Sequence, residues 1–227
     1  MKTIRGGRDK PGRDPGEAKS LSLMSSLGKR FDDVIAAIDD ANARDPKIVE
    51  IGGRTVPAEL LYGQRMSDAL ARMAADASEL LRIAVRGQHI ERWTSPRSGY
   101  PPGRVGYLKW RNDLKDYHAR RLDEIMTAAG YGPQDAARVG ALVRKERLRS
   151  DPEAQMLEDT ACIVFLTHYL TDFIGKTDEA KLARILVQTW NKMSVQGRAH
   201  AEKLDLPPNV LALLERGLKQ AREGTNS

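Results

Sequence analysis

Residues 151–174 read DPEAQMLEDTACIVFLTHYLTDFI, and this stretch predicts the helix around which the other helices pack. Its start is well marked, because a capping residue, Asp151, is followed by Pro152 and then by the acidic Glu153. The apolar residues that follow lie nearly all round the expected helix. A helix that is apolar on all sides is buried, so we expect it at the centre of the fold.

Helical spacing continues on both sides of this stretch. Phe31, Val34 and Ile38 fall on one helical face, and similar patterns recur along the chain. The expected helix starts lie near Phe31, Pro57, Asp76 or Ser78, Arg104, Pro133, Asp151, Thr177 and Ser194. Residues 47–57, KIVEIGGRTVP, are Gly-rich and β-branched, so we expect a loop with at most a small hairpin. The sequence therefore predicts an all-α fold, a single compact domain of about seven or eight helices.

Composition sets the expected limits of that domain. Residues 1–29 mix Gly, Pro, Ser and charged residues with few large apolar side chains, so we expect a disordered basic tail. We expect one helical domain over residues 30–222 and a flexible C-terminus over residues 223–227.

The single cysteine and the hydropathy of the chain indicate its compartment. Cys162 lies in the apolar run TACIVFL, which predicts a buried thiol in a reducing environment. No segment approaches the roughly twenty apolar residues of a membrane span, and the basic N-terminus lacks the apolar stretch of a secretory signal. We therefore expect a cytoplasmic protein without a membrane partner.

The positive charge is concentrated in two places. The formal net charge is +6, but residues 1–30 carry +5 and residues 82–121 carry +7, so the remainder of the chain is acidic. A local basic patch favours a defined anionic ligand over general coating of nucleic acid.

The internal basic patch coincides with the stretch that holds most of the unusual residues. Residues 87–118 read GQHIERWTSPRSGYPPGRVGYLKWRNDLKDYH and contain two of the four histidines, two of the three tryptophans and three of the six tyrosines. Three prolines and two glycines between residues 94 and 103 predict an irregular loop. Binding residues are often carried by such loops, so this stretch is where we expect the functional site.

Two histidines of this stretch could meet a pair of acids from the central helix. His89 follows one expected helix and His118 lies in the next. Glu158 and Asp159 adjoin the apolar run of the central helix. Imidazole and carboxylate groups together suit a divalent metal ion, whose identity the sequence does not fix. The alternative is that the histidines are hydrogen-bonded residues near helix ends.

The basic residues of the loop predict an anion site. Guanidinium and ammonium groups bind phosphate, and Trp93 and Tyr100 could stack on a base or cover the ligand. Arg65, in an earlier helix, could reach the same anion or pair with an acid. The alternative is a solvated basic face with the tryptophans in the core. The expected anion-binding residues are Arg65, Gln88, Arg92, Trp93, Tyr100, Arg104, Lys109 and Arg111.

The order of the segments resembles the HD superfamily of metal-dependent phosphohydrolases, which are helical. Its signature is an early histidine, a His-Asp pair and a later aspartate. Tyr62 stands where the first histidine would be, Gln88 and His89 take the place of the pair, and Asp159 matches the later aspartate. His118 matches an additional histidine of many relatives, and Lys145-Glu146 lie where some carry further ligands. The resemblance implies a metal site whose usual ligand pattern is altered.

Residues 31–216 also resemble the family described as domain of unknown function 4202. The matching phrases are LLYGQRM, AVRGQHIERW, SGYPPGRVGYLKWRNDLKDYHA, LEDTACIVFL and LDLPP. The resemblance implies an HD-like helical fold and brings no established activity.

Two functional hypotheses follow. The first is a metal-dependent hydrolase of the HD-like type that acts on a phosphorylated small molecule or nucleotide. In it His89, His118 and Asp159 hold the metal and Glu158 supports them, while Arg92 neutralises the phosphate and Glu146 transfers a proton. The second is a non-catalytic module that binds a nucleotide or RNA at a degenerate HD site.

Overall fold

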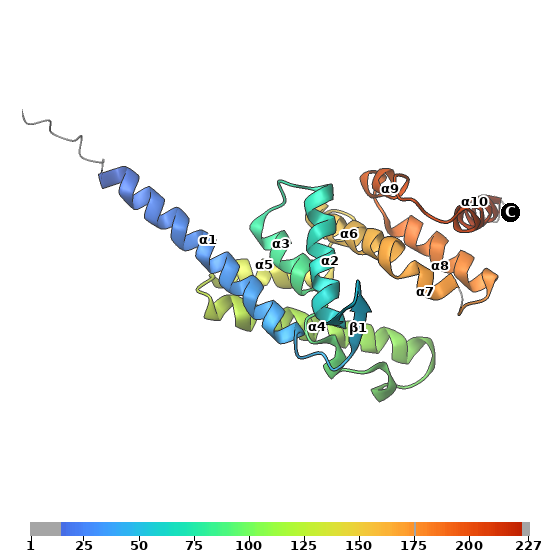
Figure 1. Ribbon diagram of the computed structural model, residues 1–227, viewed down its shortest axis with the longest axis horizontal. Helices are drawn as coiled ribbons and strands as arrows, with labels where there is room; N and C mark the ends of the chain where they lie inside the picture. Colours follow the sequence, from blue (N-terminus) through green and yellow to red (C-terminus); the bar gives the residue numbers. More distant parts are fainter. Residues whose placement is uncertain (1–14, 175, 224–227) are drawn as a thin grey trace, which may run out of the picture.

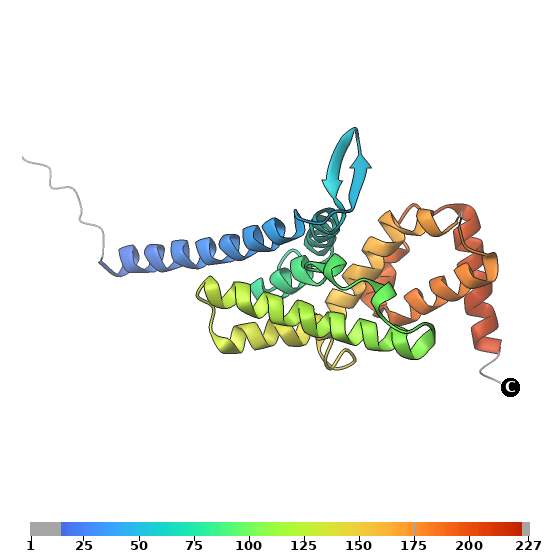
Figure 2. The same cartoon turned by 90° about the horizontal axis from the view of Figure 1, so that it is seen from below.

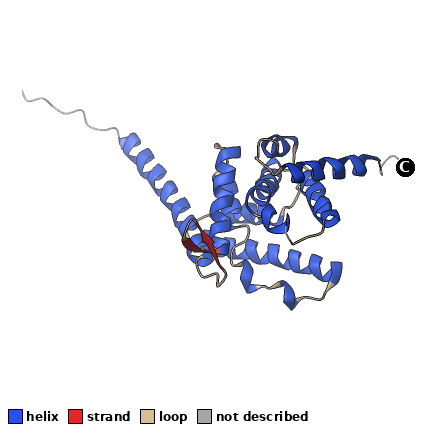
Figure 3. Cartoon of the chain, turned by 45° about the vertical axis from the view of Figure 1, so that its right-hand side comes forward, coloured by secondary structure: helices blue, strands red, loops and turns tan. Residues whose placement is uncertain are grey.

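The computed structural model describes residues 15–174 and 176–223, and it places ten α-helices and one two-stranded sheet in them (Figures 1 and 3). The all-α prediction is confirmed. The helices are α1 (Pro15–Asn42), α2 (Ala58–Met73), α3 (Glu79–Gly87), α4 (Gly103–Ala128), α5 (Pro133–Arg144), α6 (Pro152–His168), α7 (Leu170–Ile174), α8 (Glu179–Lys192), α9 (Val195–Ala201) and α10 (Pro208–Glu223).

The helix count exceeds the expected seven or eight because helical segments are divided. The predicted helix over residues 151–174 ends at His168, since the backbone of Tyr169 leaves the helical region, and α7 follows it. The last part of the chain likewise forms three helices, α8, α9 and α10.

The first helix begins earlier than the apolar spacing predicts. α1 starts at Pro15, so the expected tail is helical from residue 15, and residues 1–14 lie outside the described residues. The reason is local: Pro15 suits a first helical position, Glu17 suits the first turn, and Ala, Leu and Met follow. Figures 1 and 2 show the N-terminal half of α1 extending away from the other helices. Of the predicted flexible C-terminus over residues 223–227, Glu223 is the last residue of α10 and residues 224–227 lie outside the described part.

α6 occupies the centre of the fold, as its composition predicts. It packs against α2, α3, α5, α7, α8 and α9. Ala154 and Leu157 have no exposed surface. The carboxylate of Asp151 caps the helix by accepting hydrogen bonds from the backbone N–H groups of Glu153 and Ala154. A buried helix with its start fixed in this way aligns the elements packed on it.

The small hairpin is formed by β1 (Ile48–Ile51) and β2 (Arg54–Pro57), which pair antiparallel. Gly52 and Gly53 make the two-residue turn with φ of +56° and +74°, the left-handed conformations that this tight connection requires. Figure 2 shows the hairpin projecting from the helices next to α2.

The predicted irregular loop precedes α4 and folds back onto it. Two single turns of 3-10 helix, η1 (Arg92–Thr94) and η2 (Arg97–Gly99), lie in it. The guanidinium of Arg97 donates to the carbonyl oxygens of Tyr100, at 3.0 Å, and Pro101, at 2.8 Å. The indole N–H of Trp110 donates to the Ser95 carbonyl oxygen at 2.9 Å, so the loop is tied to α4.

None of the helices over residues 15–174 and 176–223 is both long enough and apolar enough to cross a lipid bilayer.

We expect Gly106→Ala to lower the free energy of unfolding by about 1–3 kcal/mol, because an added methyl group would overlap the Pro101 carbonyl oxygen where the loop meets α4. Gly28→Ala is the matched control, since Gly28 is also helical and has nothing within 4 Å of its added methyl group. It should raise stability by about 1 kcal/mol through helix propensity alone. Urea denaturation measures both values. Equal effects of the two substitutions would contradict the close approach at Gly106.

Candidate functional site

The structure brings the two histidines of the site stretch together. His89 lies just beyond the end of α3 and His118 lies on α4, and their ring centroids are 6.1 Å apart. The ring of Tyr62, on α2, stacks on His89 at 4.2 Å with an interplanar angle of 12°. Three helices therefore meet at this pair of imidazoles.

Both imidazoles are held in the neutral form. Nδ1 of His118 lies 2.7 Å from the carbonyl oxygen of Ile90 and must donate to it, which leaves Nε2 without a proton. Burial, and then the neighbouring His89, lowers the pKa of His118 to about 3. Although 28% of the His89 side chain is exposed, desolvation and then the charge of Arg92 lower its pKa well below the ordinary value.

A carboxylate that the sequence did not single out accompanies His89. Glu59, in the first turn of α2, places Oε2 3.6 Å from Nδ1 of His89. Burial raises the pKa of Glu59, and the charge of Arg92 opposes that shift. The pair lies beside the Tyr62 ring.

The histidines line a cavity of about 260 Å³, which we call the basic pocket. It is bounded by the turn after α3, by α4, by the end of α5 and by the end of α8. Its cationic side chains are Arg92, Arg111, Lys115, Lys145 and Lys192. Gln88, Tyr107 and Trp110 complete the polar and aromatic lining.

The cations of the basic pocket repel one another. Burial, and then the charges of Arg111 and Lys145, lower the pKa of Lys115, which indicates a positive field at its ammonium group. Among the side chains that the structure describes, no carboxylate lies within 4.0 Å of the charged groups of Arg92, Arg111 or Lys115. An anion in the cavity would relieve this repulsion.

Glu158 lies behind the basic pocket as a counter-ion. Its carboxylate accepts a hydrogen bond from Lys145 and lies 3.8 Å from Nζ of Lys192. Burial alone would raise the pKa of Glu158, but Lys145, Lys192 and Arg111 lower it overall. The predicted metal ligand is thus an ionised carboxylate already paired with two lysines.

Asp159, the other predicted carboxylate ligand, faces a different neighbour. Its Oδ1 accepts from the side chain of Gln155 and from the backbone N–H of Ser194, both at 2.9 Å. Its Oδ2 accepts from the Ser194 hydroxyl at 2.5 Å. Gly197 packs so closely that a methyl group there would lie 2.5 Å from Cγ of Asp159. Asp159 therefore fixes the start of α9, with 1% of its surface exposed.

The residues expected to hold a divalent metal do not assemble into a fitting donor set. Over the described chain, no three His, Cys, Asp or Glu side chains are grouped so as to hold a metal ion. Glu158 and Asp159 are bound elsewhere, and the histidines face cations. A divalent cation would have to enter a field that already repels Lys115.

The other predicted residues divide between the site and the outer surface. Gln88 lines the basic pocket and donates to the Tyr62 hydroxyl at 2.5 Å. The residues that line neither this pocket nor the groove described next are Tyr100, Arg104, Lys109 and Glu146. Lys109 pairs with Asp113 at 2.7 Å and Glu146 pairs with Arg144 at 2.6 Å, both on the outside.

Arg65 and Trp93 line a second cavity, of about 1140 Å³, which we call the hairpin groove. It lies between β1, α2, the loop before α4, the end of α6, and α7. His89, Arg92 and Trp110 line both the hairpin groove and the basic pocket, so the two cavities adjoin.

Some pocket residues had a signal in the sequence and others did not. Arg111, Lys115 and His118 are spaced by four and three residues, which places them on one face of α4, whereas Lys109 falls on another. Helical spacing does not place Lys145 in the basic pocket, because Lys145 follows the end of α5 and its backbone is left-handed, with φ of +59°. Lys192 comes from α8, distant in sequence.

We expect acid to destabilise the protein through His118. Its pKa is about 3 in the folded state and about 6.5 when unfolded, so the unfolded chain binds more protons between these values. The stabilisation is complete above pH 6.5 and falls by up to about 1.4 kcal/mol for each pH unit below it. His118→Asn, which can still donate to Ile90, should flatten the fall in unfolding free energy between pH 6 and pH 4. Parallel curves for the two proteins would contradict a buried neutral imidazole.

Comparison with known proteins places the chain in a family. No curated protein and no solved structure matches it. One family model matches residues 32–214, which is most of the chain, and it confirms the resemblance that the sequence motifs indicate. The protein therefore belongs to the family described as "Domain of unknown function (DUF4202)".

Proposed function

We propose that the protein binds an anionic, phosphorylated small molecule in the basic pocket. The observation that carries this proposal is the convergence of five cationic side chains from four segments on one cavity of about 260 Å³. Among the side chains described, three of these cations lack a carboxylate within 4.0 Å. Like charges gathered without counter-ions cost free energy, and a bound anion offsets that cost.

The groups that line the pocket suit phosphate in their chemistry as well as in their charge. The guanidinium groups of Arg92 and Arg111 can form paired hydrogen bonds with phosphate oxygens. Lys115 and Lys145 supply compact positive charge. The two lining histidines are neutral, so the attraction for an anion comes from the arginine and lysine side chains.

The metal-dependent hydrolysis that the HD resemblance implies stays a prediction. The donor set described above supports it less than it supports anion binding, because Glu158 and Asp159 are committed to Lys145 and Ser194. The HD-like descent of the fold and the cytoplasmic location likewise stay predictions.

Removing a pocket cation from α4 should weaken anion binding. We expect Arg111→Gln and Lys115→Gln each to lower the affinity for inorganic phosphate by about tenfold, because each removes a charge-assisted hydrogen bond. Isothermal titration calorimetry of the full chain at low salt measures the dissociation constants. The matched control is Lys109→Gln, which removes the same charge from the outer face of the same helix, where Lys109 pairs with Asp113. An equal loss in all three variants would show only a general charge effect and would contradict a defined pocket.

Removing the counter-ion should have the opposite effect. We expect Glu158→Gln to raise the affinity for inorganic phosphate by roughly fivefold, about 1 kcal/mol, because Lys145 and Lys192 then face the cavity without their carboxylate. The same titration measures the gain, with circular dichroism as the check on folding.

This substitution also separates the two hypotheses for Glu158. If Glu158 were a metal ligand, the glutamine variant would lose bound metal and any metal-dependent phosphate release. Weaker phosphate binding together with lower metal content by elemental analysis would favour the hydrolase and contradict the anion-binding proposal.

A further inference from the structure

We infer that the ligand has two parts: a terminal phosphate that occupies the basic pocket, and an uncharged, planar aromatic body that occupies the hairpin groove. This inference rests on the proposed function, since it extends the same site. It names the ligand as a monomeric aromatic phosphate ester of the nucleoside monophosphate kind.

The basic pocket and the hairpin groove share part of their lining. His89, Arg92 and Trp110 contribute to the lining of both, so a molecule seated in the basic pocket has its outer end at the groove. The pocket, at about 260 Å³, is smaller than the usual range for sites that enclose whole ligands, roughly 300–1,000 Å³. The groove, at about 1140 Å³, has room for the remainder of the molecule.

The two cavities differ in the charge of their lining. Among the described side chains, the lining of the basic pocket has five cations and no carboxylate. The groove lining is balanced, with the cations Lys47, Arg65, Arg92 and Arg97 and the acids Asp45, Glu50, Glu59 and Asp172. The negative charge of the ligand therefore belongs at one end, and the part in the groove carries no net charge.

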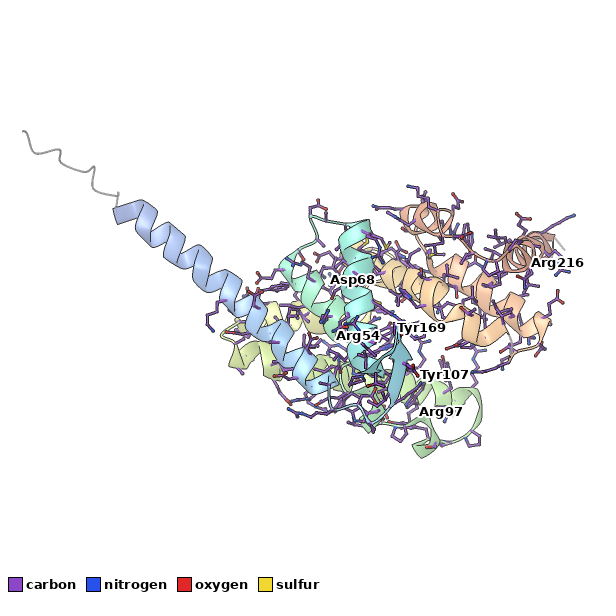
Figure 4. All side chains as sticks on the ribbon, viewed as in Figure 1. Arg54, Asp68, Arg97, Tyr107, Tyr169 and Arg216 are labelled. Carbon is purple, nitrogen blue, oxygen red and sulfur yellow. The ribbon has the colours of Figure 1, made fainter. Side chains whose placement is uncertain are left out.

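The groove has an aromatic wall. Trp93 lies on the loop before α4, Phe165 lies at the end of α6, Tyr169 lies between α6 and α7, and Phe173 lies on α7. Figure 4 shows Tyr169 beside the hairpin that carries Arg54. The guanidinium of Arg65 lies 5.3 Å from the centroid of the Tyr169 ring. Aromatic and guanidinium faces stack on planar rings, so they favour a heteroaromatic body over a flexible aliphatic one.

The same charge balance disfavours a polynucleotide. Single-stranded RNA carries a negative charge at every nucleotide, and proteins that bind it follow its backbone with a positively charged groove. The lining of the hairpin groove has as many acids as bases, so a strand bound there would meet carboxylates such as Glu50 and Asp172. One terminal phosphate satisfies the basic pocket without placing charge against these carboxylates.

Calorimetric titration of the full chain with three probes tests whether the ligand has a phosphate part and an aromatic part. The probes are inorganic phosphate, which has only the anionic end, ribose 5-phosphate, which has a non-aromatic body, and adenosine 5′-monophosphate. We expect the nucleotide to bind at least about tenfold more tightly than either of the others, from stacking in the groove.

Trp93→Ala should remove most of this difference and leave the affinity for inorganic phosphate unchanged, because Trp93 lines only the groove. Tyr100→Ala is the matched control, an aromatic residue of the same loop that lines neither cavity.

The outcomes separate this inference from the proposed function. Binding of inorganic phosphate with no gain for the nucleotide, or a gain that survives Trp93→Ala, overturns the two-part ligand and leaves the basic pocket as an anion site. Failure of every probe to bind overturns the proposed function itself. Single-stranded RNA that binds more tightly than the nucleotide, with an affinity that rises with length and falls steeply with salt, would replace the small ligand with a polynucleotide.

Discussion

Repulsion among like charges in a confined space is the constraint on which the site depends. Arg111, Lys115 and Lys145 face one small cavity, and the buried Glu158 pairs with Lys145 and Lys192 beside it. Burial, and then the charges of Arg111 and Lys145, lower the pKa of the Lys115 ammonium group. A folded protein can contain such a cluster only if burial elsewhere offsets the free energy of repulsion among the cations. A ligand of opposite charge then binds more tightly because it relieves that repulsion.

The buried core provides that offset and sets the geometry. α6 lies at the centre and presents adjacent acids to different neighbours: Glu158 meets the lysines behind the pocket, and Asp159 holds Ser194 at the start of α9. One face of α4 lines the basic pocket with Arg111 and Lys115, and another face holds the Lys109–Asp113 ion pair outside it. The imidazoles between α3 and α4 stay neutral because burial and the nearby charge of Arg92 disfavour their protonation. The two histidines that the sequence suggested as metal ligands thus line, in our proposal, a site for an anion.

Much of the fold could be predicted from local signals. The Asp151 cap and the apolar run after it predicted a central helix, and both are present. Gly130, with φ of +84°, lies just beyond the end of α4, where a glycine commonly ends a helix. These features depend on residues near one another in sequence. Apolar spacing missed the break at Tyr169 because it does not report backbone geometry. It missed the early start at Pro15 because it does not report the helix propensity of residues outside the apolar pattern. The sequence analysis included the possibility that His89 and His118 meet. It did not predict which way Glu158 and Asp159 point. Consecutive residues on a helix point about 100° apart, so either carboxylate could have faced the histidines. Lys192 reaches the pocket from α8 only through tertiary packing.

Crystals soaked in tungstate would test the central claim most directly, because tungstate is a tetrahedral oxyanion like phosphate and its anomalous scattering locates it without reference to the protein. The account predicts one strong site inside the basic pocket, with oxygens in hydrogen-bond reach of Arg111, Lys115 and Lys145. A pocket that stays empty while tungstate gathers on outer cations such as Lys109 would contradict it.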